Sequence, residues 1–143
     1  MQKGDWLGLL TVIAILVGIG LFFAYAPEAK PDVYAPVEVT GSSVTVGAQT
    51  GEQSVRVTAE VKQPSFITVH QALGEAPGPV IGVSGLLAPG SYAPLSIALP
   101  VPIVPTNDYF ILMFLDDGDG VFEAGVDLPI MSDGQVIKVK LSL

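Results

Sequence analysis

The chain has 143 residues, of which 50% are hydrophobic, with a formal net charge of −8 and no cysteine. This length accommodates one folded domain with a short extension, and not two full domains. An acidic surface repels nucleic acid, so we expect no nucleic-acid partner, and the lack of cysteine excludes disulfides and thiolate chemistry.

An uncharged apolar segment, WLGLLTVIAILVGIGLFFAYA, occupies residues 6–26. At ~1.5 Å per residue a helix of this length crosses a hydrocarbon core of ~30 Å. We therefore predict a short N-terminal tail over residues 1–5 and a single transmembrane helix over residues 6–26. The segment is longer than the apolar region of most signal peptides, and Pro27 would follow the cut at Ala26, which favours a retained anchor. Cleavage as a signal peptide, or pilin-type cleavage after Gly4, stays an alternative.

The flanking charges predict the orientation of this anchor. Lys3 precedes the apolar segment, whereas Glu28, Lys30 and Asp32 follow it, so the tail is expected in the cytoplasm and the rest outside. This makes the chain a single-pass protein of the cell membrane with an extracytoplasmic globular domain. A small-residue pair within the anchor, Ala14 and Gly18, would allow another helix to pack closely, and so offers a route to a protein partner.

PEAKPDVYAP, residues 27–36, is predicted to be a stiff, extended tether because proline restricts both itself and the residue before it. From residue 37 to residue 143 the pattern changes to period-two alternation, which is typical of strands with one buried face. The clearest case is SVRVTAEVK, in which Val55, Val57, Ala59 and Val61 share one face.

The spacing of these strands and of the Gly, Pro and Asp turns between them predicts an all-β domain, a β-sandwich. PVPIVP, residues 100–105, lacks too many N–H groups for a central strand and is expected at an edge or between sheets. YFILMFL, residues 109–115, is apolar on both faces and should be a central strand. The expected strands are 37–40, 43–46, 54–62, 65–73, 80–83, 92–99, 109–115 and 136–143.

Three groups of residues in this domain match a known pattern. They are Gln49 with Phe66, Val69 and His70; then Gly82, Ser84, Leu87 and Gly90; and then Asp116 to Phe122 with Asp127 and Pro129. Over residues 37–143 the chain resembles an uncharacterised domain family of membrane-anchored surface proteins in archaea and bacteria. The resemblance implies an immunoglobulin-like sandwich outside a membrane, and it implies no chemistry.

The loop LDDGDGVFEAGVDLP concentrates carboxylates without any basic residue. Against the calcium-loop pattern D-x-[DN]-x-[DN]-G-x5-E, Asp117, Asp119 and Gly120 match, whereas Leu115 and Val126 stand where two further ligands are required. Asp116 and Asp127 lie one residue after Leu115 and Val126, respectively, so each missing ligand has a carboxylate next to it. Calcium is the cofactor that such a loop would take, and the alternative is an Asp-Gly turn whose carboxylates face water. The candidate metal ligands are Asp116, Asp117, Asp119, Glu123 and Asp127.

His70 is the only histidine, and no catalytic group can be assembled around it from sequence. Ser84 lies in GVSG, which lacks the G-x-S-x-G spacing of a nucleophile elbow. We interpret His70 as a strand residue satisfied by hydrogen bonds, and expect no enzyme activity. The predicted role is a binding, adhesion or structural module at the cell surface, with protein partners bound by the anchor or the sandwich. The alternatives are an accessory subunit of a membrane complex and a pilin-like filament subunit.

Overall fold

The structure is a computed structural model that describes residues 35–49, 53–141 and 143. Within these residues the chain forms β-strands and no helix, which confirms the prediction of an all-β domain. The strands are β1 (Val37–Glu38), β2 (Ser43–Val46), β3 (Ser54–Val61), β4 (Ser65–Leu73), β5 (Ala76–Val83), β6 (Gly90–Ala98), β7 (Tyr109–Leu115), β8 (Leu128–Ser132), β9 (Gln135–Val136) and β10 (Lys138–Leu141).

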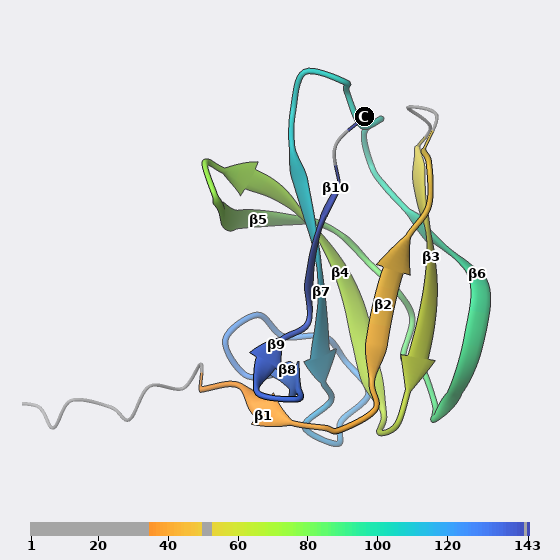
Figure 1. The fold of residues 1–143 in the computed structure, drawn as a ribbon, viewed down its shortest axis with the longest axis vertical. Coiled ribbons are helices and arrows are strands. Elements are labelled where there is room, and N and C mark those ends of the chain that lie inside the picture. The colour runs from red at the N-terminus through yellow and green to blue at the C-terminus, as the bar shows by residue number, and fades with distance from the viewer. Residues whose placement is uncertain (1–34, 50–52, 142) are drawn as a thin grey trace, which may run out of the picture. The chain divides into compact units, whose positions relative to one another are not determined.

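These strands form two sheets that lie against each other (Figure 1). The larger sheet has the order β1-β8-β7-β4-β5, with β10 paired to β7 and β9 paired to β8, and the smaller sheet has the order β2-β3-β6. Strand β1 runs parallel to β8, whereas the other paired strands run antiparallel. The arrangement is that of a β-sandwich.

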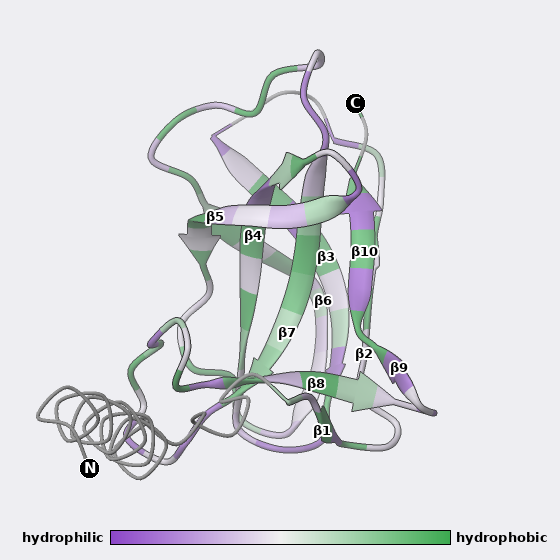
Figure 2. Ribbon diagram, turned by 90° about the vertical axis from the view of Figure 1, so that its left-hand side faces the viewer, coloured by the Kyte–Doolittle hydropathy of each residue, from purple (hydrophilic) through white to green (hydrophobic). Residues whose placement is uncertain are grey.

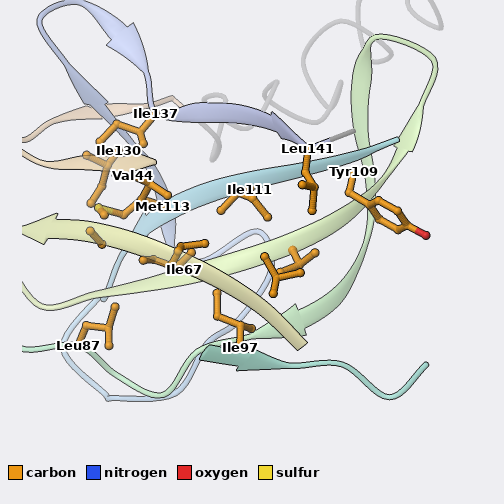
Figure 3. Packing of buried hydrophobic residues seen from close by; sticks show 14 of the residues in the cluster. Val44, Ile67, Leu87, Ile97, Tyr109, Ile111, Met113, Ile130, Ile137 and Leu141 are labelled. Carbon is orange, nitrogen blue, oxygen red and sulfur yellow. The ribbon is translucent and has the colours of Figure 1, made fainter. Parts of the chain in front are cut away.

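The main core lies between the two sheets, as Figure 3 shows for residues from both. The face of β3 that the alternation predicted is buried throughout: Val55, Val57, Ala59 and Val61 are each at most 2% exposed. Ile67 of β4 and Ile111 of β7 meet them from the larger sheet. Period-two alternation in β3 therefore encodes which side of the smaller sheet faces inward.

Strand β7 is central in the larger sheet, as its sequence predicted. On one edge, every residue of β7 pairs with β4. On its other edge, β7 pairs with β10 and β8. Figure 2 shows β7 as hydrophobic along its length, whereas β10 alternates. Ile111 and Met113 face the main core, and Phe110, Leu112 and Phe114 form a second buried cluster on the outer face.

Several strand boundaries differ from the expected ones. Strand β5 begins at Ala76 rather than at residue 80, and β6 begins at Gly90 rather than at residue 92. The last expected strand is divided into β9 and β10 around Ile137, whose N–H donates to the Ile130 carbonyl at 2.9 Å. Strand β8 was not predicted at all. Strands β5, β6 and β8 each contain a proline, and pairing with neighbouring strands overrides that local signal.

The proline-rich segment 100–105 forms no strand and connects β6 of the smaller sheet to β7 of the larger sheet. This confirms the prediction of an inter-sheet crossing. The predicted tail, transmembrane helix and most of the tether lie outside the described residues. Within the part that is described, no helix is long and apolar enough to span a membrane.

Candidate functional site

The acidic loop, residues 116–127, joins the adjacent antiparallel strands β7 and β8. At its start the N–H of Asp116 donates to the Pro64 carbonyl at 3.0 Å. At its end Leu128 pairs with Leu115, the last residue of β7. The larger sheet therefore holds both ends of the loop, so the loop carboxylates are displayed from a rigid base.

Asp127 organises the interior of this loop, where its side chain is only 1% exposed. Its Oδ1 accepts a hydrogen bond from the N–H of Asp117 at 3.2 Å, and its Oδ2 accepts one from the N–H of Glu123 at 2.8 Å. Its own N–H donates to the Glu123 carbonyl at 3.0 Å. A buried carboxylate requires such donors, and here the hydrogen bonds connect the part of the loop around Asp117 to the part around Glu123.

The remaining aspartates also accept hydrogen bonds from backbone N–H groups in the loop. Asp116 Oδ1 accepts from Gly120 at 3.0 Å, Asp117 Oδ1 from Asp119 at 3.2 Å, and Asp119 Oδ1 from Val121 at 2.8 Å. These are the local turns that aspartate favours, and Gly120 permits one of them by adopting a φ of 75°. The loop therefore curls inward at Asp116 and Asp117.

Three of the five predicted metal ligands come together. Asp116, Asp117 and Asp127 each offer a carboxylate oxygen, and these oxygens lie within 4.8 Å of one another. Asp119 and Glu123 are not part of this group. Oxygen ligands of this kind suit a hard divalent cation, which would complete its shell with carbonyl groups and water. Oxygens that already accept one N–H keep a further lone pair for a metal.

Phe122 turns the acidic loop back onto the outer face of the larger sheet. Its ring centroid lies 5.7 Å from that of Phe66 and 5.4 Å from that of Phe114, both in edge-to-face arrangements. Phe122 thereby covers part of the outer cluster formed by β7. Because the sequence of β7 is apolar on both faces, it indicated that something must cover this face, but not which residue does so.

His70 lies on the same outer face, and both of its ring nitrogens are engaged. Nδ1 lies 2.8 Å from the Gly78 carbonyl, which can only accept, so Nδ1 carries the proton. Nε2 then accepts from the hydroxyl of buried Thr68 at 2.8 Å. The ring stacks on Phe114 with centroids 6.1 Å apart. Burial lowers the pKa of His70, although the bond to Gly78 opposes this effect. The interpretation of His70 as a satisfied strand residue is confirmed.

Beside these side chains lies an apolar groove of about 440 Å³, which we call the outer groove. Its floor is formed by Leu112 and Phe114 of β7, together with His70. One wall is the β5 segment 77–80, and the opposite wall is formed by Phe122, Ala124, Gly125 and Pro129. The volume falls within the range of small-ligand sites, and most of the lining is apolar. Nothing in the sequence identified this groove, because its walls come from strands and loops far apart along the chain.

Ser84, the serine considered beside His70, has a structural role. Its hydroxyl donates to the Gly85 carbonyl at 2.8 Å and accepts from the N–H of Ile67 at 2.9 Å. These bonds attach the end of β5 to β4. These hydrogen bonds of Ser84 and His70 are made to Ile67, Gly85, Thr68 and Gly78 and do not link the two side chains, which is not the arrangement of a nucleophile and its base.

Gln49, another residue of the family pattern, also has a structural role. Its side-chain amide pairs with the backbone of Arg56, donating to the carbonyl at 2.9 Å and accepting from the N–H at 3.0 Å. At Arg56 the amide thus makes the two backbone hydrogen bonds that a neighbouring strand would otherwise make to β3.

Comparison with known proteins identifies the family of this domain. No curated protein and no solved structure matches the chain. A family model, the domain of unknown function DUF7282, matches residues 42–142, which is most of the chain and includes the outer groove and the acidic loop. The resemblance to an uncharacterised domain family is thereby confirmed, and the chain belongs to the DUF7282 family.

Proposed function

We propose that this protein is a non-catalytic display module: an immunoglobulin-like β-sandwich held on the extracytoplasmic side of the cell membrane by residues 6–26. The observation that carries the proposal is the outer groove, an apolar depression beside an acidic loop on the exposed side of the larger sheet. A depression of this size suits the binding of a partner or ligand. The apolar segment and the proline-rich tether in the sequence support the attachment to a membrane.

The hydrogen bonds of His70 support a non-catalytic role. A general base needs a free lone pair directed at a substrate, whereas Nε2 of His70 accepts from buried Thr68 and Nδ1 donates to Gly78. The histidine instead connects the floor of the outer groove to its β5 wall. Its position therefore favours a binding or structural module over an enzyme.

Within this module the acidic loop would bind calcium. The convergence of Asp116, Asp117 and Asp127 supports this, because three carboxylates this close repel one another unless a cation compensates them. In this arrangement Asp119 and Glu123 serve the loop in other ways: Asp119 caps the turn at Val121, and the Glu123 backbone bonds to Asp127. A bound ion would stiffen one wall of the outer groove.

The membrane arrangement can be tested on the full chain in intact cells with a membrane-impermeant amine reagent. Lys62 and Lys138 are exposed on the sandwich and should be labelled in intact cells. Lys3 should be labelled only after lysis, so it serves as an internal control. Labelling of Lys62 only after lysis would contradict the proposed orientation. Recovery of the chain in stoichiometric complex with other membrane proteins, or as surface fibres, would favour the accessory-subunit or filament alternative.

A further inference from the structure

Lys138 lies on the outer face of the larger sheet, next to the outer groove. In the pairing of β10 with β7, Lys138 is opposite Leu112, which belongs to the groove floor. Opposite residues of an antiparallel pair share a face, with Cβ atoms roughly 4.5–5.5 Å apart, so the side chain of Lys138 leaves the sheet beside the groove. Figure 2 shows β10 next to β7, with hydrophilic positions in β10 beside the hydrophobic β7.

The ammonium group of Lys138 lies over an aromatic ring. Its Nζ is 5.1 Å from the ring centroid of Phe110, which pairs with His70 of the groove floor. The other lysines of the described residues, Lys62 and Lys140, form ion pairs with carboxylates, whereas Lys138 has no carboxylate partner within residues 35–49, 53–141 and 143. The ammonium group therefore keeps N–H donors for an anion at the edge of the groove.

The β5 wall of the groove is poorly suited to a peptide. Pro77 and Pro79 have no N–H group. The carbonyl of Gly78, between them, already accepts a hydrogen bond from His70. A peptide that docks on a sheet as an added strand depends on such backbone groups. The groove therefore favours a compact ligand without peptide groups.

The rings in the groove favour a flat aromatic ligand. The rings of His70 and Phe114 stack with an interplanar angle of 23°. Phe122 meets Phe114 edge to face, with ring centroids 5.4 Å apart. Aromatic rings prefer such offset-stacked and edge-to-face partners, so a further ring would find both kinds of contact here.

We propose that the outer groove binds a small aromatic carboxylate, with its ring against Phe114 and Phe122 and its carboxylate at the ammonium group of Lys138. A hydrogen bond between two charged groups of this kind is stronger than one between neutral groups. The acidic loop forms another side of the groove and repels an anion, which directs the carboxylate toward Lys138. This inference names the ligand class for the proposed binding function and rests on it.

Isothermal titration calorimetry of the full chain in nanodiscs of zwitterionic lipid tests the ligand class, with empty nanodiscs as the blank. The probes are naphthoate, its neutral amide naphthamide, and octanoate, an acid with an aliphatic body. Naphthoate should bind about fivefold more tightly than naphthamide, as expected for one exposed ion pair. Equal binding of the acid and the amide, or tighter binding of octanoate than of naphthoate, would overturn the proposal.

Three substitutions assign the effect to this groove. Lys138→Met keeps an unbranched stem over Phe110 and removes the charge, so naphthoate should bind only as tightly as naphthamide does. Lys62→Met is the matched control, because it removes the same charge just after β3 in the smaller sheet and should leave both affinities unchanged. Ala124→Trp adds a large side chain at an exposed position of the groove wall and should abolish binding of both probes. A fivefold preference for the acid that persists in Lys138→Met would refute the role of Lys138.

Failure of the ligand class can be distinguished from failure of the binding function. If naphthoate and naphthamide bind equally and Ala124→Trp abolishes both, the groove binds ligands but the proposed class is wrong. If none of the three probes binds, the ligand class is wrong as well. The display function is decided separately in that case, by the labelling of Lys62 in intact cells.

Discussion

Asp127→Asn tests whether the buried carboxylate holds the acidic loop together. The substitution preserves the shape of the side chain but turns one acceptor into an NH2 group that faces a backbone N–H, either that of Glu123 or that of Asp117. Losing one charge-assisted hydrogen bond and weakening the other costs roughly 3 kcal/mol. Removing a charge near Asp116 and Asp117 relieves repulsion of about 1 kcal/mol in a water-like medium. The free energy of unfolding should therefore fall by about 2 kcal/mol.

Differential scanning calorimetry of the full chain in detergent, with a calcium chelator present, measures this loss. A change of about 2 kcal/mol corresponds to a Tm lowered by roughly 8 °C for a domain of this size. Asp119→Asn is the matched control, because it removes the same charge from an exposed position whose single bond to Val121 asparagine can also accept. Its effect should stay within about 0.5 kcal/mol. A Tm of Asp127→Asn equal to or above that of the wild type would refute this account of the loop.

Three further predictions follow from the same structure. Calcium at about ten times its dissociation constant should raise the stability by about 1.4 kcal/mol, and Asp116→Asn with Asp117→Asn should abolish this gain in calorimetry. The pKa of His70 is lowered below its usual 6.5 by burial, so the unfolded chain binds the proton at higher pH. The free energy of unfolding, measured with urea, should therefore decrease as the pH falls through 6.5 and level off below the lowered pKa. In Gly82→Ala the new Cβ would overlap Leu99 Cδ2, which should cost about 1–3 kcal/mol.

Each of these predictions has its own control. A Tm that does not respond to calcium or to its removal by chelator would leave the acidic loop as a solvated turn. The pH dependence should disappear in His70→Gln, and its persistence would assign it to other groups. Gly85→Ala adds a Cβ where no atom lies within 4 Å, so its stability should be unchanged. A loss in Gly85→Ala as large as that in Gly82→Ala would show that the effect does not come from overlap with Leu99.

Strands whose burial is visible in their own residues were predicted from the sequence, whereas a strand that depends on contacts with distant segments was not. Strand β3 was recognised because each second residue is buried, and β7 because its burial on both faces leaves an unbroken apolar run. Strand β8 was missed because Pro129 and Asp127 suggest a turn. It forms because Ile130 is buried in the core and because β7 and β1 pair with its two edges. Those contacts are distant in sequence and leave no periodic pattern.

In the candidate metal site, too, the sequence indicated some features and the fold decided others. The composition of the loop identified five carboxylates, and the glycines indicated that the chain could curl. Which carboxylates converge depends on Asp127, whose burial follows from the pairing of β7 with β8 and draws Asp117 and Glu123 toward it. Asp119 instead caps a local turn. Ligand type is a property of the residues, whereas ligand geometry is a property of the strands that hold them.

By itself the sequence determined that this domain is all-β, which strand faces are buried and where carboxylates accumulate, because these depend on residue type and on a two-residue period. Only the tertiary structure decided that Phe122 folds back over Phe66 and Phe114, that His70 connects β4 to the β5 wall, and that an apolar groove lies between them. These features need β4, β5, β7 and the acidic loop at one place. Hydrophobic burial brings such segments together without regard to their separation along the chain.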